Sequence, residues 1–376
     1  MSEAINFDGA APPGTIDLCI GQPSADLLPI NLVRKASESF FDSAQPFELN
    51  YGVMQGDPRF LNSLAGFLTA NYGESTSSDE LFVTGGNSQG LDLVSAVLAR
   101  PGDTIFVEEP SFFLAFQIFR DHGLNIVGIP IDEDGLCIDS LEQALTAHSP
   151  TFLYTIPSYH NPSGHCTTEA RRRRIVELAD EHDFLVIADE VYQLLNYFGA
   201  PPPAYGTMIA SERVVSLGSF SKILAPGMRL GWIQTCQPLL DRIATSGFIN
   251  SGGSVNHMGS LIIRQAIEAG SLDKHIHMLR SVYGGRVAAM DNALHEHFDG
   301  LAEWVRPDGG YFFWLRLKDP VDITPLQSRA SERETGFQAG GAFSSKGQFK
   351  NCARLCFAHY NEDDIREGIA RIRGLF

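Results

Sequence analysis

The strongest constraint on the fold is an alternation of short apolar runs with helix-type patterns that starts near residue 80. The apolar runs lack polar alternation, which is typical of strands buried on both faces. Their alternation with helices indicates βαβ units and a mostly parallel sheet, and therefore an α/β fold. The expected strands are 80–86, 103–110, 125–132, 151–156, 184–192, 212–220 and 229–236. The expected helices are 88–99, 112–123 and 168–182.

The pattern changes after about residue 255, where long helical sequence replaces the alternation. Helical spacing runs over 259–298, and we expect it to break at Gly270 and again at Gly284-Gly285. Two strand-like runs and a closing helix follow, at 309–317, 353–360 and 362–376. This composition predicts a smaller α+β unit.

These two patterns predict two domains. The large domain is expected to span 46–265. The short N-terminal segment is expected to pack with the C-terminal unit, so that 1–45 and 266–376 form the small domain.

Charge and cysteine usage exclude several classes of protein. The formal net charge of −17 argues against nucleic acid or an anionic membrane as a bulk partner. No run of 18 apolar residues exists, and the N-terminus lacks the basic and apolar regions of a signal peptide. The six cysteines are scattered without a C-x2-C pair, so we expect neither a metal site nor a disulfide framework. A cytoplasmic location is therefore predicted.

Polar residues at the expected strand ends are the candidates for a site, because open parallel sheets bind ligands beyond the carboxyl ends of their strands. The stretch TGGNSQG, 84–90, follows a strand and opens a helix. Gly85 and Gly86 allow close backbone approach, and the helix N-terminus offers free N–H groups suited to a phosphate. Taken alone, an ordinary turn is the more common explanation of this pattern.

Two further strand ends carry polar residues. Asn161 precedes Pro162 in a turn-forming pair, which by itself is explained by a turn. Asp189 ends an apolar strand, and a carboxylate there needs a partner or a function, although helix capping explains it equally well. Tyr192, three residues later, is placed to reach the same cavity.

Lys222 stands out because the chain has only six lysines and none between Lys35 and Lys274 except this one. A lysine in a partly desolvated pocket becomes a nucleophile able to form a Schiff base, although lone lysines usually lie on the surface. Hydroxyls and a guanidinium surround it in the sequence, at Ser219, Ser221 and Arg229, and such groups suit a phosphate.

Taken together, these stretches offer an anion seat, a Schiff-base lysine, an acid at a strand end, a phenol, and a serine–arginine pair for a dianion. Pyridoxal 5'-phosphate carries one carbonyl, one phosphate, one ring nitrogen and one phenolic oxygen, and it matches all of them.

The sequence resembles the class I/II aminotransferases, which are fold-type I pyridoxal-phosphate enzymes, and within them the aminoadipate and kynurenine aminotransferase-like branch. The motifs that carry the resemblance keep their order: IGQPSADLLP, NYGVMQGDPRF, TGGNSQGLDL, EEPSFF, HNPSG, DEVY, SFSKILAPGMRLGW, PDGGYFFWL and ARLCFA. The resemblance implies a large domain with a mostly parallel seven-stranded sheet sandwiched by helices, plus a smaller α+β domain.

The resemblance also implies a role for each matching residue. Lys222 would form the internal aldimine and move the proton between the substrate Cα and the cofactor. Asp189 would pair with the ring nitrogen, and Arg354 would bind the substrate α-carboxylate. The remaining implied contacts are Gly86, Asn87, Ser88, Ser219 and Arg229 at the phosphate, Tyr192 and Asn161 at the phenolic oxygen, Phe112 on the ring, Gly21 near the substrate, and Tyr51 at the phosphate of a neighbouring subunit.

Two departures from the family pattern remove no catalytic group. Phe112 stands where Tyr or Trp is commoner, and Ala339-Gly340 replaces a Pro-Gly pair. His160 precedes Asn161 where an aromatic residue or Gln is commoner, which we interpret as a mild change beside the substrate.

Two other stretches leave alternatives open. The run 171–174 of four arginines is interpreted as a solvated helix face with local ion pairs. The Gly- and Ser-rich stretch 248–259 is either a subunit-bridging or substrate loop, or a plain connection. His257 within it is no ligand candidate.

The leading hypothesis is an aminotransferase that moves an amino group between an L-amino acid and a 2-oxo acid, with homodimers sharing their active sites. The alternative is another pyridoxal-phosphate reaction on the same scaffold, such as β- or γ-elimination, substitution, C–S lyase chemistry or a ring-forming condensation. A ligand sensor fused to a DNA-binding module is not expected, because the GQP motif already begins at Gly21.

Overall fold

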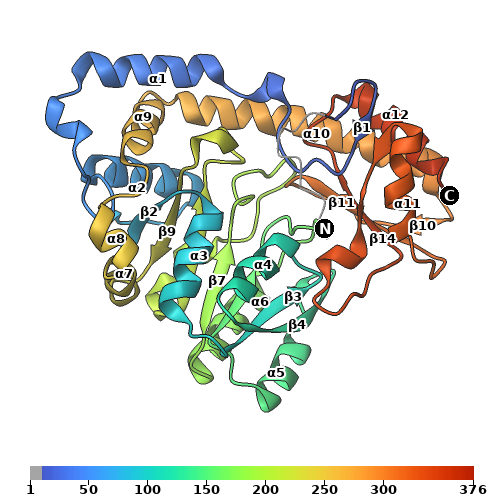
Figure 1. Ribbon diagram of the computed structural model, residues 1–376, viewed down its shortest axis with the longest axis horizontal. Helices are drawn as coiled ribbons and strands as arrows, with labels where there is room; N and C mark the ends of the chain where they lie inside the picture. The colour runs from blue at the N-terminus through green and yellow to red at the C-terminus, as the bar shows by residue number, and fades with distance from the viewer. Residues whose placement is uncertain (1–10) are drawn as a thin grey trace.

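A computed structural model describes residues 11–376 of the chain, and one large sheet lies at its centre (Figure 1). Its five neighbours β8, β7, β6, β3 and β4 run parallel, whereas β9 is antiparallel to the strands on both sides. In spatial order the strands are β2 (Leu81–Thr84), β9 (Gly231–Thr235), β8 (Val214–Ser219), β7 (Leu185–Asp189), β6 (Phe152–Thr155), β3 (Thr104–Glu109), β4 (Asn125–Asp132) and β5 (Gly135–Leu136).

The large sheet has eight strands where the resemblance implied seven, because β5 adds a short edge strand. Gly135 has a positive φ of 94°, which lets the chain double back so that β5 pairs antiparallel with the end of β4. A strand of two residues is too short to leave a period in the sequence. The other seven strands lie where the apolar runs predicted them.

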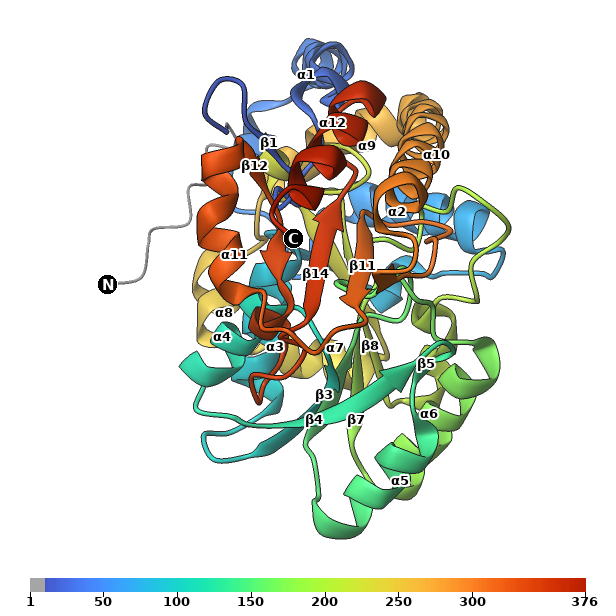
Figure 2. The same ribbon diagram turned by 90° about the vertical axis from the view of Figure 1, so that its right-hand side faces the viewer.

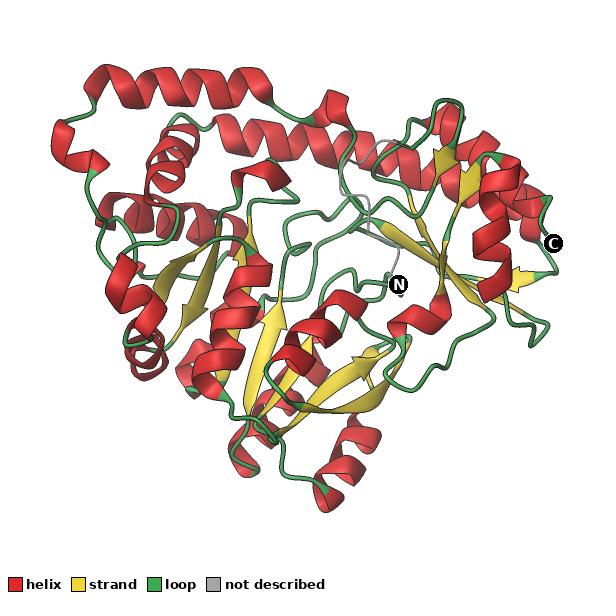
Figure 3. Cartoon of the chain, viewed as in Figure 1, coloured by secondary structure: helices red, strands yellow, loops and turns green. Residues whose placement is uncertain are grey.

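Helices cover both faces of the large sheet, which is why its strands are continuous apolar runs. Figure 2 shows α3 and α4 on one side of the strands and α5 and α6 on the other, and Figure 3 shows the strands enclosed between helices. The helices are α1 (Ile30–Ser43), α2 (Pro58–Tyr72), α3 (Asn87–Leu98), α4 (Phe113–Asp121), α5 (Ile138–Ala147), α6 (Glu169–Glu181), α7 (Gln237–Ala244), α8 (Gly247–Gly252), α9 (His257–Glu268), α10 (Ser271–Phe298), α11 (Thr324–Arg329) and α12 (Glu362–Arg373).

Helix α10 runs unbroken through Gly284-Gly285, so the break expected there was wrong. The break at Gly270 is confirmed, because this residue adopts φ 62° between α9 and α10. At Gly285 a Cβ would lie 2.5 Å from Glu362 Oε1 of α12, so the glycine gives room to a helix packed against α10 (Figures 1 and 2). Here tertiary packing, rather than a helix end, accounts for the glycine.

The C-terminal unit contains a smaller antiparallel sheet, where the sequence predicted an α+β unit with two strands. The two strand-like runs became its central pair, β11 and β14, which are antiparallel. The small sheet is ordered β10 (Ala302–Glu303), β11 (Phe312–Leu317), β14 (Cys352–Cys356) and β13 (Gln338–Ala339).

The N-terminal segment connects both units. Strand β1 (Ile16–Asp17) pairs in parallel with β12 (Thr335–Gly336) of the C-terminal unit. Helix α1 then runs back across the molecule and packs on α9, which lies between α1 and α2 (Figure 1). The division of the chain at 46 and 265 therefore stays a prediction, since α1 contacts a helix on the other side of that boundary.

None of the helices over residues 11–376 is both long enough and apolar enough to cross a membrane. All six cysteines are unpaired, and two of them, Cys352 and Cys356, are buried in β14. Within the same residues, no group of His, Cys, Asp and Glu is arranged to hold a metal ion.

Candidate active site

The candidate site lies at the carboxyl ends of the parallel strands β7 and β8. Asp189 is the last residue of β7 and Ser219 the last of β8, and the two strands are neighbours in the sheet. Lys222 follows in the turn that leads to β9. The start of α3 reaches the same place, because Asn87 Nδ2 donates to Asp189 Oδ1 at 2.7 Å. The sheet thus gathers side chains that lie more than 100 residues apart in the sequence.

The N-terminus of α3 forms an anion seat at one end of the site. Gly86 precedes the helix with φ 88°, a conformation that glycine adopts at no steric cost. The backbone N–H groups of Asn87 and Ser88 lie in the first turn, where they have no carbonyl partner within the helix and sit at the positive end of its dipole. Arg229 borders the seat, since a Cβ on Gly86 would lie 3.0 Å from Arg229 Nη2. The arginine is exposed and its charge is available to an anion.

Ser219 and Arg229 are brought together by a tight turn, η5 (Pro226–Met228). Phe220 N donates to Leu230 O at 3.1 Å, so the chain returns beside the end of β8 after the turn. Ser219 Oγ is buried and accepts the N–H of Ser221 at 3.1 Å. The turn at the Pro-Gly pair therefore brings Arg229 back beside the end of β8, close to Lys222 in the chain.

Asp189 is a buried carboxylate held by two donors. Asn87 Nδ2 donates to Oδ1, and the Tyr154 hydroxyl donates to Oδ2 at 2.9 Å. Burial raises the pKa of Asp189 above its ordinary value, while the two hydrogen bonds and the Lys222 charge counteract this rise. A further cation or N–H donor at this carboxylate would offset the remaining cost of burying its charge. A protonated ring nitrogen is such a group.

Lys222 is a half-buried amine with a lowered pKa. The pKa of Lys222 is lowered to about 8, mainly by burial; the charges of Arg354 and Arg229 also lower it, whereas Cys356 and Asp189 raise it. Its Nζ donates to the carbonyl of Gly21 at 2.9 Å and lies 5.1 Å from the centre of the Tyr311 ring. About a tenth of this lysine is therefore the nucleophilic free amine at pH 7, far more than for an ordinary lysine.

Arg354 lies on β14 of the small sheet, whereas the anion seat follows a strand of the large sheet. Its side chain is buried, with Nη1 donating to Asn161 Oδ1 at 3.1 Å and Nη2 donating to the Cys19 carbonyl at 2.9 Å. The Phe312 ring lies 4.2 Å and the Phe343 ring 5.1 Å from the guanidinium carbon. Nε is buried without a partner. No carboxylate neutralises this arginine among the hydrogen-bond partners that the described residues provide, which suits it to a substrate carboxylate.

The remaining predicted residues differ in how far their side chains are buried. Tyr192 is buried against the rings of Tyr311 and Phe312, with ring centroids 5.4 and 6.1 Å away. Phe112 is half-buried at the N-cap of α4. Tyr51 is 85% exposed, so it stands outside the site of its own chain.

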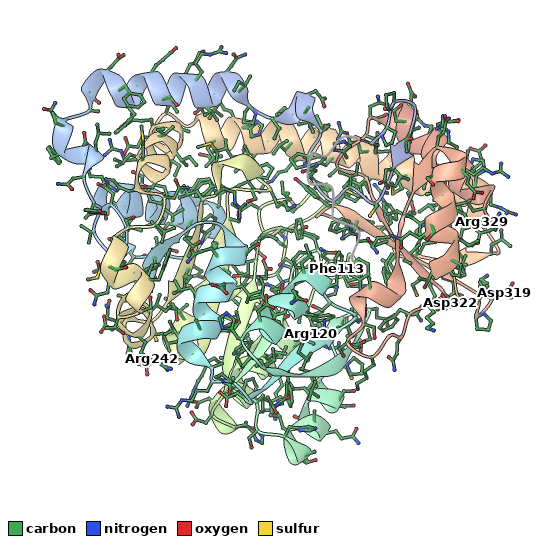
Figure 4. The ribbon with its side chains drawn as sticks, in the orientation of Figure 1. Phe113, Arg120, Arg242, Asp319, Asp322 and Arg329 are labelled. Atoms are coloured by element: carbon green, nitrogen blue, oxygen red, sulfur yellow. The ribbon has the colours of Figure 1, made fainter. Side chains whose placement is uncertain are left out.

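The loop after Phe343, whose ring lies beside Arg354, is attached to the large sheet. Figure 4 shows Phe113 of α4 near the middle of the molecule, whereas Arg242 and Arg329 lie at its edges. Phe113 packs edge-on against Phe343, with centroids 5.3 Å apart. Glu109, at the end of β3, accepts the Ser345 hydroxyl at 2.7 Å, which ties the loop after Phe343 to the large sheet.

Sequence reasoning missed several residues of the site. Tyr154 was hidden inside an apolar strand, where its phenol is the only polar side-chain atom of the run Phe152 to Tyr154. Cys19 contributes a backbone carbonyl, which no side-chain pattern reveals. Tyr311 donates its hydroxyl to the Lys222 carbonyl at 3.2 Å and was attributed only to a strand motif.

The interpretation of the four arginines as a solvated face was wrong for one of them. Arg172 is fully buried and donates to the carbonyls of Pro157, Thr167 and Pro203. Its neighbours on α6 behave as expected; Arg173, for example, pairs with Glu169 at 2.6 Å. Helical spacing explains the difference, because one of four consecutive positions faces the sheet.

His160, which we interpreted as a mild change beside the substrate, has a buried ring with partners inside the protein. The ring is buried, with Nε2 3.1 Å from Glu108 Oε2 and Nδ1 2.9 Å from Ser163 Oγ. The change from the commoner family residue is therefore an internal contact of the loop that carries Asn161.

Pyridoxal phosphate fits the residues present. The anion seat at α3 and Arg229 suit its phosphate, the lowered pKa of Lys222 suits its aldehyde, and Asp189 suits its ring nitrogen. The Nε of Arg354 and the Oδ1 of Asn87 are buried without hydrogen-bond partners. Buried polar atoms usually have such partners, and polar groups of a bound ligand would provide them.

The chain is similar to known aminotransferases over almost its whole length. It is 33% identical to aromatic-amino-acid aminotransferase 1 of Thermococcus litoralis, over 95% of this chain and 87% of the relative. The crystal structure of Pyrococcus horikoshii kynurenine aminotransferase, in complex with PMP, superposes with a TM-score of 0.90 at 32% identity, covering 96% of this chain and 90% of that one. LysN, the alpha-aminoadipate aminotransferase of Thermus thermophilus, superposes with a TM-score of 0.88 at 27% identity, covering 96% and 92%.

These relatives include the kynurenine and aminoadipate aminotransferases, which confirms the branch that the motifs indicated. The fold-type I architecture and the use of pyridoxal phosphate are confirmed with it. The sequence model of the family described as aminotransferase class I and II matches residues 13–372. The chain therefore belongs to the class I and II aminotransferases and is a pyridoxal-phosphate-dependent enzyme that catalyses transamination.

Proposed function

We propose that this aminotransferase transfers the amino group of an L-amino acid to a 2-oxo acid with Lys222 as its catalytic base. The observation that carries the proposal is the environment of this lysine. The charges of Asp189, Arg354 and Arg229 all act on its amine, and burial lowers its pKa to about 8. One amine thus lies within electrostatic reach of the groups for the ring, the substrate carboxylate and the phosphate.

Bound pyridoxal phosphate supplies an aldehyde that takes up the amino group and a ring that withdraws electrons from the substrate. Lys222 has the free amine needed to take a proton from the substrate Cα and to return it. Asp189, held by Asn87 and Tyr154, keeps the ring nitrogen cationic. Tyr192 is assigned to the phenolic oxygen and Phe112 to the face of the ring.

The two ends of the site orient the reactants. The N–H groups of Asn87 and Ser88, with Gly86, Ser219 and Arg229, are assigned to the phosphate. At the other end Arg354 binds the α-carboxylate in its plane, and Asn161 orients the guanidinium through the bond to Nη1. The carbonyl of Gly21 holds the lysine amine between the two ends.

The function is tested by adding an amino acid to the holoenzyme without any 2-oxo acid. We expect the absorbance of the lysine-bound cofactor to give way to that of pyridoxamine phosphate, and a 2-oxo acid to restore it. Lys222→Ala should abolish both changes. Release of ammonia or of a side-chain leaving group without an acceptor would instead favour an elimination.

For the substrate side chain we propose an aromatic or large apolar group. Two phenylalanine rings, Phe312 and Phe343, lie 4.2 and 5.1 Å from the Arg354 guanidinium carbon at the proposed substrate end. Relatives of similar identity are named for aromatic amino acids and kynurenine. A panel of amino donors tests this, and we expect phenylalanine or kynurenine to give higher kcat/KM than aspartate. Preference for aspartate would contradict it.

We also propose that the enzyme is a homodimer of the cytoplasm. Exposed apolar side chains gather in the stretch that includes Phe47, Leu49, Tyr51 and Val53, between 58% and 85% exposed, and a subunit interface would bury them. In the dimer Tyr51 would reach the partner's phosphate. The six unpaired cysteines suit a reducing compartment.

A further inference from the structure

The Gly- and Ser-rich stretch between α8 and α9 contacts the phosphate end of the site. Asn256 lies at the N-cap of α9 and donates its Nδ2 to two consecutive carbonyls, that of Met228 at 2.8 Å and that of Arg229 at 2.6 Å. These carbonyls belong to the turn that carries the Arg229 guanidinium to the anion seat. One side-chain amide thus fixes the backbone of the predicted phosphate-binding arginine.

This backbone needs an external hold, because Arg229 adopts the left-handed conformation, with φ 48° and ψ 50°. A residue with a branched or long side chain adopts this conformation at a cost in free energy. If the two hydrogen bonds from Asn256 are removed, the turn is free to relax towards ordinary angles. The guanidinium would then leave its position beside Gly86.

The neighbours of Asn256 contact the segment that carries Tyr51. Ser254 N donates to the carbonyl of Gly52, the residue after Tyr51. A Cβ on Gly52 would lie 2.6 Å from His257 Nδ1 and 2.7 Å from Ser254 Cβ. Residues 254–257 therefore lie between the Arg229 turn and the exposed Tyr51.

Glycines clear the space for these contacts. A Cβ on Gly259, one turn into α9, would collide with the Asn256 amide. A Cβ on Gly253 would lie 2.6 Å from the Gly52 carbonyl oxygen. Gly253 and Gly259 are thus each required by a close approach, which favours a closely packed segment over a plain connection.

We propose that Asn256 is a positioning residue for the phosphate of the cofactor: it holds Arg229 at the start of α3. The inference rests on the proposed role of Arg229 at the phosphate. It goes beyond that role because Asn256 touches no part of the cofactor and acts only through the backbone of the turn. Its effect should therefore fall on ligands that carry a phosphate and spare those that lack one.

The experiment compares binding of pyridoxal phosphate and of pyridoxal to apoenzyme prepared from the full-length holoenzyme. Pyridoxal carries the same aldehyde and ring without the phosphate. We expect Asn256→Ala to raise the Kd for pyridoxal phosphate about tenfold or more, since it removes two hydrogen bonds that hold a charged group in place. The Kd for pyridoxal should stay within about twofold of the wild-type value.

Two further variants make the test specific. Gly259→Ala keeps the asparagine but pushes its amide away, so it should reproduce the selective loss even if Asn256→Ala folds poorly. Asn250→Ala removes an exposed asparagine from the same stretch and should leave both constants unchanged. Equal Kd values for pyridoxal phosphate in all variants would overturn the proposal, and so would an equal loss for pyridoxal.

Failure of the proposed function would look different. If wild-type apoenzyme bound pyridoxal phosphate no more tightly than pyridoxal, the anion seat itself would be wrong, whatever the variants do. A strong phosphate preference in the wild type that persists in Asn256→Ala and Gly259→Ala would leave the function standing and remove only the role of Asn256.

Discussion

At the scale of single residues, the site depends on how burial changes the charge of Lys222. Burial lowers the pKa of this amine from 10.5 to about 8, because the ammonium loses hydration that its neighbours replace only in part. The like charges of Arg354 and Arg229 contribute to this lowering. The same two arginines are the proposed binding groups for the substrate carboxylate and the phosphate, so the charges that attract the ligands also free the amine.

This shift predicts a pH dependence for loading of the apoenzyme. Only the neutral amine attacks an aldehyde, so the rate of pyridoxal phosphate binding should rise as the pH passes through about 8. Stopped-flow absorbance at a series of pH values measures it. A midpoint above 10, the range of an ordinary lysine, would contradict the burial argument. Between about 8 and 10.5 the unfolded chain also binds more protons at this lysine than the folded one, so the contribution of Lys222 to apoenzyme stability rises with pH there.

The second residue-scale prediction concerns Arg354. Arg354→Lys should raise the KM for the amino acid and for the 2-oxo acid together, by about tenfold to a hundredfold, because an ammonium cannot form two parallel bonds to a carboxylate. Affinity for pyridoxal phosphate should hardly change, since the anion seat lies at the other end of the site. Steady-state kinetics with both substrates measures the effect. Arg316→Lys, an exposed change in β11, is the matched control. An unchanged KM would remove Arg354 from the carboxylate site.

At the scale of secondary-structure elements, the sequence predicted what local pattern determines and missed what packing determines. Strand ends, the turn before α3 and the Pro-Gly turn before Arg229 all carry their own signals. Tyr154 does not, because its role depends on the register of β6 beside β7. Arg172 was misjudged for the same reason: its burial depends on carbonyls from three separate loop positions. The eighth strand was missed because two residues leave no period.

The glycine pair inside α10 gives an element-scale prediction. Gly284 has no atom closer than 3.8 Å to the position of a Cβ, so Gly284→Ala should stabilise the protein by about 0.5–1 kcal/mol through the entropy of the unfolded chain. Gly285→Ala should increase the stability of the protein less, because its Cβ displaces the Glu362 carboxylate. Thermal unfolding of the two variants and of the wild type measures which protein is the most stable. If Gly284→Ala were the less stable of the two, α10 would not be continuous there.

At the scale of the whole molecule, the described chain builds an almost complete site and leaves Tyr51 outside it. Tyr51 is 85% exposed in the single chain, although residues 254–257 connect its neighbour Gly52 to the Arg229 turn. The backbone beside Tyr51 is thus held by close contacts, while its side chain is exposed. This combination is explained if Tyr51 serves the site of a second copy. In the proposed dimer, the exposed apolar side chains around it would be buried by that copy.

Mixed dimers test this arrangement directly. Tyr51→Ala and Lys222→Ala should each be strongly impaired alone, because every site in either homodimer has one defect. In a mixed dimer one site combines Lys222 of the first chain with Tyr51 of the second and is intact, while the other site carries both defects. Random pairing makes about half of the dimers mixed, so about a quarter of wild-type activity should return after the two variants are unfolded and refolded together. If Tyr51 served its own chain, no combination would contain an intact site and no activity would return. Wild type refolded with Lys222→Ala sets the yield of the procedure, since half of its sites remain intact whichever way Tyr51 acts.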